Sequence, residues 1–231
     1  MSITVRSVAS RDEIEAADGV FDAVWHAPQR ERLSRELLRA MTAHTNLLLG
    51  AFDGDACIGV VTGWWGRDND GSVWLWSARL GVIESHRRGG VATMLKREQA
   101  RIAHERGVRE IRWTFDPMRA RNATFNLATL GARAIAYIDD AYGPREDRFN
   151  AGERTDRLLV SWTPNDPVPA AAPARMRVTV PTDIDDYLSK SRERRAQWRA
   201  KVRSQMRAAF DAGSIATGFD PPATYLFGGS S

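Results

Sequence analysis

Apolar and polar positions follow two different periods along the first two thirds of the chain. Apolar residues alternate in "ITVRSV" and "VREIRWTF", whereas "TNLLLGAFDGDACIGVVTGWWG" holds two apolar runs separated by Asp53-Gly54-Asp55. Alternation with a period of two is typical of half-buried strands, and an Asp-Gly pair between apolar runs indicates a hairpin. We therefore predict a sheet whose further strands are "SVWLWSARLGVI", "RAIAYI" and "TDRLLVSW".

Segments in which apolar residues recur at helical spacing lie between several of these strands. Apolar residues recur at helical spacing after Ser10, and Glu13 follows three residues later, which indicates a capping box at the start of a helix. Further helices are expected over Arg30 to Ala43, over Arg88 to Arg106 and in "ARNATFNLATLGA". Because one strand precedes the helix over Arg88 to Arg106 and another follows it, we predict a parallel strand pair there.

The last third of the chain has a different pattern. "TPNDPVPAAAPAR" contains four prolines and almost no large apolar residue, so it is expected to be a stiff linker. We therefore predict a main domain over residues 1–163, a linker over 164–175 and a C-terminal extension over 176–231. In this extension a long helix is expected over Asp183 to Ala212, followed by two short strands, "SIATGF" and "TYLFG".

Composition narrows the class of protein. The chain has 231 residues, of which 43% are hydrophobic and 27% charged, as is usual for a globular protein, and its net charge of +4 is too small to indicate nucleic-acid binding by itself. The single cysteine, Cys57, excludes an internal disulfide and is predicted to be a buried small apolar residue, and four scattered histidines predict no metal site. No apolar run has the length of a membrane span, so we expect a cytoplasmic protein without membrane contact.

Two arginines and two glycines stand together in "SHRRGGVATML", between a predicted strand and a predicted helix. Glycines let backbone N–H groups approach a ligand closely, and the N-terminus of a helix carries about half a positive charge. The arginines add full positive charges, so the stretch predicts a site for a phosphate-like anion. The alternative is a plain glycine turn that leads into a solvated basic helix.

The motif Arg87-x-x-Gly90-x-Ala92 after a strand, followed by "NATFNLATLGA", resembles the acyl-CoA pyrophosphate loop and the next motif of the GCN5-related N-acetyltransferases, over about residues 3 to 163. The resemblance implies an α/β fold with a mixed, mostly antiparallel twisted sheet of the acyl-CoA N-acyltransferase type and flanking helices, to which this chain adds the C-terminal extension of helix and strands. It also implies an enzyme that transfers an acetyl or other short acyl group from acyl-CoA to an amine by direct attack in a ternary complex. Acetyl-CoA would be the cosubstrate, and no metal is expected.

The resemblance also implies which residues hold the cofactor. The main chain around Gly81 would pair with the pantetheine arm, and the N–H groups from Arg88 to Ala92 would cradle the pyrophosphate. Asn122 matches the family's cofactor-facing asparagine, and a helix N-cap is its alternative role. The full set of predicted cofactor-binding residues is Leu80, Gly81, Val82, Arg87, Arg88, Gly89, Gly90, Val91, Ala92 and Asn122.

The family often places a tyrosine in the helix after the asparagine, as the acid that protonates the departing thiolate. Leu127 stands there in this chain, so Tyr142 in "DDAYGPRED" is the candidate acid, with Tyr137 as a second choice. Asp116, at the end of "IRWTFDP", is the candidate base, acting directly or through water. The alternatives are a packed loop tyrosine for Tyr142 and an Asx turn before Pro117 for Asp116.

The acceptor is predicted to be the amine of a small molecule, for example an amino acid. An α-amino group has a pKa of about 8, whereas a lysine amine near 10.4 needs a strong base that the sequence does not show. Arg79, Arg154 and Arg157 are candidate partners for an acceptor carboxylate, and their alternative roles are internal ion pairs. Five tryptophans on predicted strands either line a pocket for an apolar acceptor or belong to the core: Trp64, Trp65, Trp74, Trp76 and Trp113.

Two further function classes stay open. A protein or peptide amine is the alternative acceptor. The stretch Lys190 to Arg207 has eight basic residues against one acidic, so the chain is alternatively a CoA-binding or nucleic-acid-binding regulator. The basic residues surround an apolar stripe with Trp198 and Val202, as in a helix docked on a domain, and we therefore do not expect nucleic-acid binding. Homodimerisation is left open.

Overall fold

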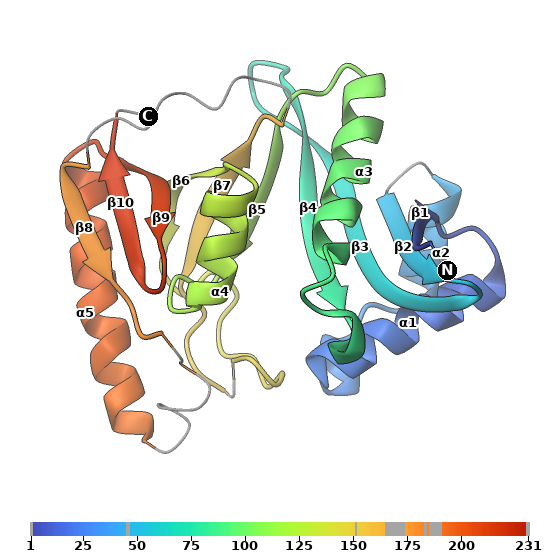
Figure 1. Ribbon diagram of the computed structural model, residues 1–231, viewed down its shortest axis with the longest axis horizontal. Coiled ribbons are helices and arrows are strands. Elements are labelled where there is room, and N and C mark those ends of the chain that lie inside the picture. Colours follow the sequence, from blue (N-terminus) through green and yellow to red (C-terminus); the bar gives the residue numbers. More distant parts are fainter. Residues whose placement is uncertain are drawn as a thin grey trace. The chain divides into compact units, whose positions relative to one another are not determined.

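The computed structural model describes residues 2–44, 47–150, 152–164, 174–182, 184 and 191–229. The chain forms two compact units (Figure 1). Unit 1 contains Met1–Arg112 and Pro144–Arg154, and unit 2 contains Trp113–Gly143 and Thr155–Ser231. Each unit is described by itself below. The linker predicted over 164–175 lies mostly outside the described residues, and the three-part division of the chain stays a prediction.

Unit 1 is built on a sheet of antiparallel neighbours, β1 (Thr4–Ser7), β2 (Leu47–Asp53), β3 (Ala56–Arg67) and β4 (Val73–Val82). The start of β5 (Ile111–Phe115) then adds to β4 in parallel, through the pairs Leu75↔Ile111 and Trp76↔Arg112. The predicted parallel pair is therefore confirmed, and so is the hairpin turn at Gly54, whose φ of 60° only glycine adopts readily.

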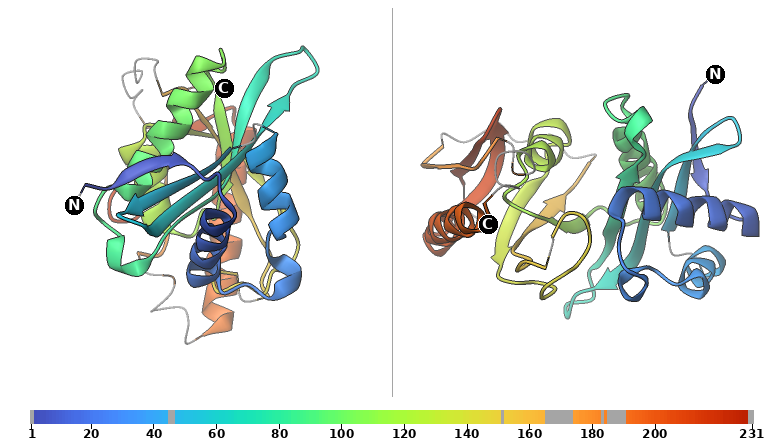
Figure 2. Two further views of the ribbon diagram at one scale, coloured as in Figure 1. Left: turned by 90° about the vertical axis from the view of Figure 1, so that its right-hand side faces the viewer. Right: turned by 90° about the horizontal axis from the view of Figure 1, so that it is seen from below.

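Helices cover both faces of this sheet: α1 (Arg11–Trp25), α2 (Arg35–Ala43) and α3 (Val91–Glu105), with short 3₁₀ turns η1 (Gln29–Glu31) and η2 (Glu84–His86). Figure 2 shows α1 and α2 on one face and α3 on the other. One core cluster joins α1 and α2 to β2 and β3 through Phe21, Leu38 and Val60, and another joins α3 to the sheet through Val61 and Leu95. We call these two sides the α1 face and the α3 face.

The capping box predicted at the start of α1 is present, because Ser10 Oγ accepts from the Glu13 N–H and the Glu13 carboxylate accepts from the Ser10 N–H. The single helix predicted over Arg30 to Ala43 is wrong in its first half. The chain forms η1, becomes extended at Arg32, and begins α2 only after Ser34, whose side chain accepts from the Leu37 N–H.

Unit 2 contains five further strands in the order β7-β6-β9-β10-β8, all antiparallel to their neighbours within this group. Their bounds are β6 (Arg133–Ile138), β7 (Arg157–Trp162), β8 (Met176–Thr179), β9 (Ile215–Asp220) and β10 (Thr224–Gly228). β9 of the C-terminal extension pairs with β6, through Ala134↔Ala216. β9 and β10 match the two predicted strands, whereas β8 was not predicted from the sequence.

The helices of unit 2 differ from their predicted extents. The short helix α4 (Ala120–Ala123) continues into a π-helical turn, η3 (Thr124–Thr129). The predicted long helix is α5 (Arg192–Asp211), capped by Ser191 rather than by residues near Asp183. Ile184, expected on that helix, lies in a turn, and residues 183 and 185–190 lie outside the described part of the chain. The chain as a whole thus has the predicted α/β fold, with mostly antiparallel strands and flanking helices.

Candidate functional site

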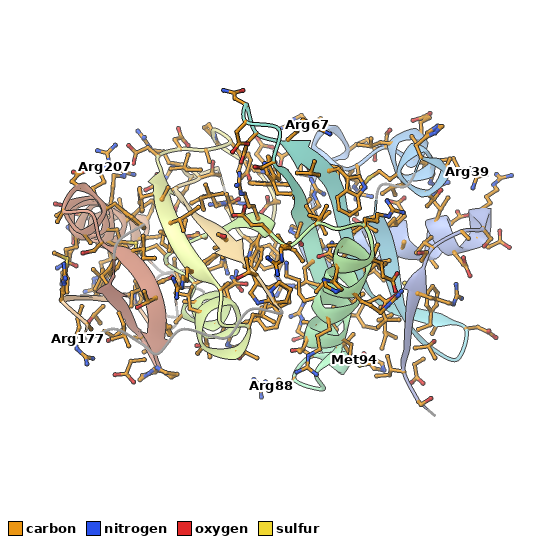
Figure 3. The ribbon with its side chains drawn as sticks, turned by 90° about the horizontal axis from the view of Figure 1, so that it is seen from above. Arg39, Arg67, Arg88, Met94, Arg177 and Arg207 are labelled. Atoms are coloured by element: carbon orange, nitrogen blue, oxygen red, sulfur yellow. The ribbon has the colours of Figure 1, made fainter. Side chains whose placement is uncertain are left out.

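The turn between β4 and α3 contains the predicted anion site. Arg87 Nε donates to the Val82 carbonyl at 3.0 Å, and Arg88 is left-handed with a φ of 70°. Figure 3 shows Arg88 projecting outward from this turn. Gly90 is the N-cap of α3 with a φ of 81°; it offers no capping side chain, and the first turn holds no acidic residue. The N-terminal dipole of α3 is therefore not neutralised by its own first turn.

Packing does not explain the glycines of this turn. A Cβ atom added to Gly90 would meet nothing within 4 Å, and one added to Gly89 would meet only the His86 carbonyl at 3.6 Å, an ordinary contact. Gly81 differs, because a Cβ there would lie 2.6 Å from the Trp25 ring. The space beside Gly89 and Gly90 is thus open, and both residues are exposed, which leaves room for a ligand next to their backbone.

The strand that leads into the turn has one open edge. β4 pairs with β3 along its whole length, from Val73 to Val82, but its ladder with β5 consists only of the pairs made by Leu75 and Trp76. Among the described strands, the segment from Ser77 to Val82 therefore has no ladder partner on that edge. Unpaired backbone groups along such an edge can bind the amides of an extended ligand.

A β-bulge interrupts β4 next to this edge. Val61 pairs with Leu80 but Gly63 pairs with Ser77, so two β4 residues oppose Thr62 alone. Ser77 lies on the α3 face, where its hydroxyl is 2.8 Å from Gln99 Oε1, and beyond the bulge Leu80 packs on the same face. The bulge reverses the alternation of side chains.

As a result Arg79 lies on the α1 face, with its Cζ atom 5.9 Å from the centre of the Trp25 ring. Arg79 Nη2 donates to the Glu31 carbonyl at 2.8 Å. Burial lowers the pKa of Arg79, and the nearby charge of Arg145 adds to this effect. Arg145 is itself paired with Glu31 at 3.4 Å and with Asp147 at 3.2 Å. Within the described residues no carboxylate forms an ion pair with Arg79, so the salt-bridged alternative for this arginine is not found there.

Unit 2 holds the predicted acid. Tyr142 lies in a turn, as predicted, and is 49% exposed. Its hydroxyl is 2.7 Å from Thr114 Oγ1, and its backbone N–H donates to Thr155 Oγ1 at 2.8 Å. The Arg157 guanidinium lies 5.6 Å from the ring centre. Two hydroxyl groups therefore meet at the surface of unit 2, one of them from β5.

Asp116, the predicted base, is a buried partner of α5. Asp116 Oδ1 accepts from the Met118 N–H at 2.9 Å, which is the Asx turn proposed as its alternative role. The carboxylate also pairs with Arg199 at 3.5 Å. Burial alone would raise its pKa, but the positive charges of Arg199, Arg157 and Arg119 outweigh burial and lower it. A carboxylate held in its ionised form by an ion pair is a weak proton acceptor.

The other predicted residues have mixed outcomes. Asn122 is exposed on α4, and its alternative role as a helix N-cap is wrong because Arg119 is the N-cap. Arg154 is exposed in unit 1. In unit 2, Arg157 is buried, and its Nη1 donates to the carbonyl of Asp156 at 2.8 Å.

Several buried polar residues were not predicted from the sequence, among them Asn126 and Lys96. Asn126, in η3, is 5% exposed and accepts from Trp113 Nε1 at 3.2 Å. Lys96, on α3, is 1% exposed and donates to Ser77 Oγ at 2.9 Å, and burial lowers its pKa strongly. Lysine is almost always exposed, so a lysine on a basic amphipathic helix gives no signal of burial.

The predicted tryptophans differ in their burial, and Cys57 has a raised pKa. Trp64 is 43% exposed and stacks on Trp76, with ring centres 6.5 Å apart, whereas Trp113 belongs to the core as its alternative role required. Burial raises the pKa of Cys57 to about 11, so its thiol is a poor nucleophile.

Among the described residues no group of three or more metal-binding side chains occurs. Within the same residues, no helix combines the length and apolar character needed to cross a membrane.

Comparison with known proteins places this geometry in a family. Residues 14–126 match the model of the acetyltransferase (GNAT) family. Solved structures of similar fold include NAA60 from Arabidopsis thaliana in complex with a bisubstrate analogue, at 16% identity and a TM-score of 0.57, covering 71% of this chain and 99% of that one. No curated protein sequence matches the chain.

Two other structures show the same fold. The ribosomal-protein-S18-alanine N-acetyltransferase from Escherichia coli has 12% identity and a TM-score of 0.55, with 74% of this chain and 99% of that one covered. The IAA acetyltransferase from Bacillus cereus has 14% identity and a TM-score of 0.52, with coverage of 70% and 99%. The resemblance that begins at Arg87-x-x-Gly90-x-Ala92 is confirmed, because residues 14–126 match a GNAT-type acetyltransferase domain.

Proposed function

We propose that this protein transfers an acetyl or other short acyl group from acyl-CoA to the amine of a small molecule that carries a carboxylate, such as an amino acid. The observation that carries the proposal is the continuous backbone surface of unit 1, in which the open edge of β4 leads directly into the glycine turn and the N-terminus of α3. NAA60, which has the same fold, was solved with acetyl-CoA.

The residues of this surface suit acyl-CoA. The backbone from Leu80 to Val82 offers the hydrogen bonds of a strand edge to the amides of pantetheine. Gly89 and Gly90 leave room for the pyrophosphate, the dipole of α3 favours its charge, and Arg88 adds a full positive charge. Arg87 supports the turn through its bond to the Val82 carbonyl. Val91 and Ala92 contribute their N–H groups from the first turn of α3, and Asn122 is the remaining cofactor contact.

The chemistry is direct aminolysis of the thioester. The neutral acceptor amine attacks the thioester carbonyl, the C–S bond breaks, the amine loses one proton, and the CoA thiolate gains one. Tyr142 is the proposed acid that protonates the thiolate. We do not extend the proposal to Asp116 as base, since its ion pair with Arg199 disfavours proton uptake. No acyl-enzyme is required, and the high pKa of Cys57 argues against one.

The acceptor proposal rests on Arg79. The bulge turns this arginine onto the α1 face, where no carboxylate among the described residues forms an ion pair with it and only the charges of Asp147 and Glu31, beyond ion-pair distance, attract it. A carboxylate on the acceptor would supply that partner by a charge-assisted bond. Trp64 and Trp76 stack on the same face and would pack against an apolar acceptor side chain. Arg157 already binds a carbonyl in its own unit, so Arg157 and Arg154 are secondary candidates.

A peptide N-terminus is the second candidate acceptor. It is favoured by the fold neighbours solved with peptide-like ligands, among them Arabidopsis thaliana Naa50 with a bisubstrate analogue, at 16% identity, a TM-score of 0.53 and coverage of 70% of this chain and 98% of that one. An α-amino group is common to both classes, whereas a carboxylate on the same carbon as the reacting amine belongs only to the free amino acid. The two proposals can therefore be separated by the carboxylate alone.

The cofactor site is tested by calorimetric titration of acetyl-CoA into the wild type, Gly89→Ala and Gly19→Ala. Both glycines have room for a Cβ and neither has a positive φ, so both variants should fold normally. We expect Gly89→Ala to bind acetyl-CoA at least about tenfold more weakly, because its methyl group occupies the space proposed for the pyrophosphate, and Gly19→Ala to bind like the wild type. Equal affinity of all three proteins, or no binding by the wild type, would refute the site.

The acceptor is tested by steady-state kinetics with matched pairs of acceptors, each an L-amino acid and its carboxamide, and with short peptides. We expect the free acids to be preferred, and Arg79→Gln to lose that preference by about tenfold or more while acetyl-CoA binding is kept. A preference for carboxamides and peptides that survives in Arg79→Gln would assign the peptide class instead.

A further inference from the structure

The turn that carries Tyr142 is held by a buried hydroxyl. Thr155 is fully buried, and its Oγ1 accepts from the Tyr142 N–H at 2.8 Å and donates to the Gly143 carbonyl at 3.0 Å. The Thr155 carbonyl accepts from the Ala141 N–H at 2.9 Å. Three consecutive residues of the turn are thus bonded to one threonine, two residues before β7. Because Tyr142 is half exposed, its own packing contributes little to fixing its position.

Thr155 is in turn bonded to a strained residue. The Thr155 N–H donates to Asp140 Oδ1 at 2.9 Å, and Asp140 has a left-handed φ of 46°. A left-handed backbone is unfavourable for a residue other than glycine, so it persists only where its surroundings hold it. The Asp140 N–H donates to Asp156 Oδ1 at 3.1 Å and supplies that hold.

Asp156 connects this turn to the C-terminal extension. Its side chain is fully buried, and Oδ2 accepts from the Tyr137 hydroxyl at 2.8 Å and from Arg203 Nε and Nη2 at 2.9 and 2.7 Å. A buried carboxylate needs such charged and polar partners to offset its loss of hydration. Arg203 belongs to α5, outside the residues matched by the family model. A continuous series of hydrogen bonds therefore leads from α5 to Tyr142.

We propose that Arg203 is a positioning residue for acyl transfer. Through Asp156, Asp140 and Thr155 it fixes the turn so that the Tyr142 hydroxyl stays against Thr114 Oγ1, at the 2.7 Å seen in the structure. The C-terminal extension thereby contributes to the reaction by holding the Tyr142 hydroxyl in position. Arg203 itself does not contact the substrate. This inference rests on the proposed role of Tyr142 as the acid of the N-acyltransferase reaction.

The test is a double-mutant cycle of Arg203→Gln and Tyr142→Phe, with kcat and the KM for acetyl-CoA measured for all four proteins. We expect Arg203→Gln to lower kcat by about tenfold or more and to leave KM within about twofold, because only the acid is displaced. In the Tyr142→Phe background the same change should cost less than about twofold, since the hydroxyl to be positioned is already absent.

Two further variants make the test specific. Arg203→Lys keeps the charge and should recover part of kcat, whereas Arg194→Gln removes an exposed arginine of the same helix and should leave kcat unchanged. If Arg203→Gln does not fold, Thr155→Val against Thr155→Ser interrupts the same series of bonds while the ion pair stays intact. The cycle with Tyr142→Phe is then made with these two variants.

The outcomes separate this inference from the proposed function. An equal loss of kcat in both backgrounds would show a general effect on the fold and overturn the positioning role. A normal kcat in Tyr142→Phe would also overturn the positioning role, because Tyr142 would then not be the acid. The proposed N-acyltransferase function would still hold in that case, provided that the protein binds and consumes acetyl-CoA. Failure of the wild type to bind or consume acetyl-CoA would overturn both.

Discussion

At the scale of single residues, Asp116 shows how one carboxylate can suit two interpretations. The sequence places it at the end of a strand before Pro117, where both a general base and an Asx turn are reasonable. The structure shows the Asx turn with the Met118 N–H and an ion pair with Arg199. The distinguishing information is the position of an arginine 83 residues further along the chain, which no local pattern contains.

We predict that Asp116→Asn destabilises the protein by about 1.5–3 kcal/mol, because the buried Arg199 loses the charge of its carboxylate partner. Urea unfolding of the wild type and of Asp116→Asn measures the difference. The double variant Asp116→Asn with Arg199→Gln should recover part of the loss, since it removes both charges. A loss below about 1 kcal/mol in the single variant would contradict the importance of this pair.

The same pair has a defined pH dependence. The pKa of Asp116 in the folded protein is below the 3.8 of the free side chain, so the folded state binds fewer protons than the unfolded state in this range. Its stabilising contribution is therefore present above about pH 4 and is lost as the pH falls through the folded pKa. Acidification from pH 5 to pH 3 should reduce the stability of the wild type more than that of Asp116→Asn.

At the scale of elements, the features that depend on a few neighbouring residues, such as helix caps and tight turns, were predicted from the sequence. The start of α1 follows from Ser10 and Glu13, and the hairpin between β2 and β3 follows from Gly54. The bulge in β4 was not predicted. It turns Arg79 toward Trp25 of α1, and the sequence does not show where α1 lies relative to β4. For the same reason the burial of Lys96, and the place where α5 begins, could not be predicted from periodicity alone.

The first turn of α1 allows a direct test of this local control. The Ala9 and Ser10 N–H groups donate to the Glu13 carboxylate at 2.8 and 3.1 Å, and these bonds lower the pKa of Glu13 to about 2. We predict that Glu13→Ala costs about 0.5–2 kcal/mol at neutral pH. Glu15→Ala, on the same helix, removes only an exposed ion pair and should cost less than about 1 kcal/mol.

The pH dependence of this cap checks its cause. Because the folded pKa of Glu13 is depressed from 4.5 to about 2, its stabilisation is present above about pH 4.5 and is lost as the pH falls toward 2. Thermal unfolding should therefore show a difference between the wild type and Glu13→Ala that shrinks over that range. A difference that does not change with pH would mean that the methylene groups of Glu13, rather than its charge, stabilise α1.

At the scale of the whole molecule, three arginines of the basic helix α5 are explained by ion pairs within their own unit. Arg199 pairs with Asp116, Arg203 with Asp156, and Arg207 with Asp139, so these arginines, at intervals of four residues on α5, face buried or half-buried carboxylates. Charges neutralised in this way do not contribute to an electrostatic nucleic-acid site. This observation supports the sequence-based expectation that the helix docks on a domain.

We predict that the chain does not fold stably without residues 165–231. Removal of α5 would leave Asp116, Asp139 and Asp156 without the arginines described above, and removal of β9 would expose the edge of β6. The truncated protein should therefore be insoluble or should unfold without a cooperative transition. Solubility and urea unfolding of the truncated and complete chains measure this effect.

The prediction has a control that isolates the buried charges. In the complete chain, replacing the three arginines of α5 together by glutamine keeps β8, β9 and β10 but removes the partners of the carboxylates. If the ion pairs are decisive, this triple variant should lose most of the stability that truncation removes, because the buried carboxylates of Asp116 and Asp156 each lose a charged partner. If it unfolds at the same urea concentration as the wild type, strand pairing along β6 is instead what makes the extension indispensable, and the basic residues of α5 would again need another explanation.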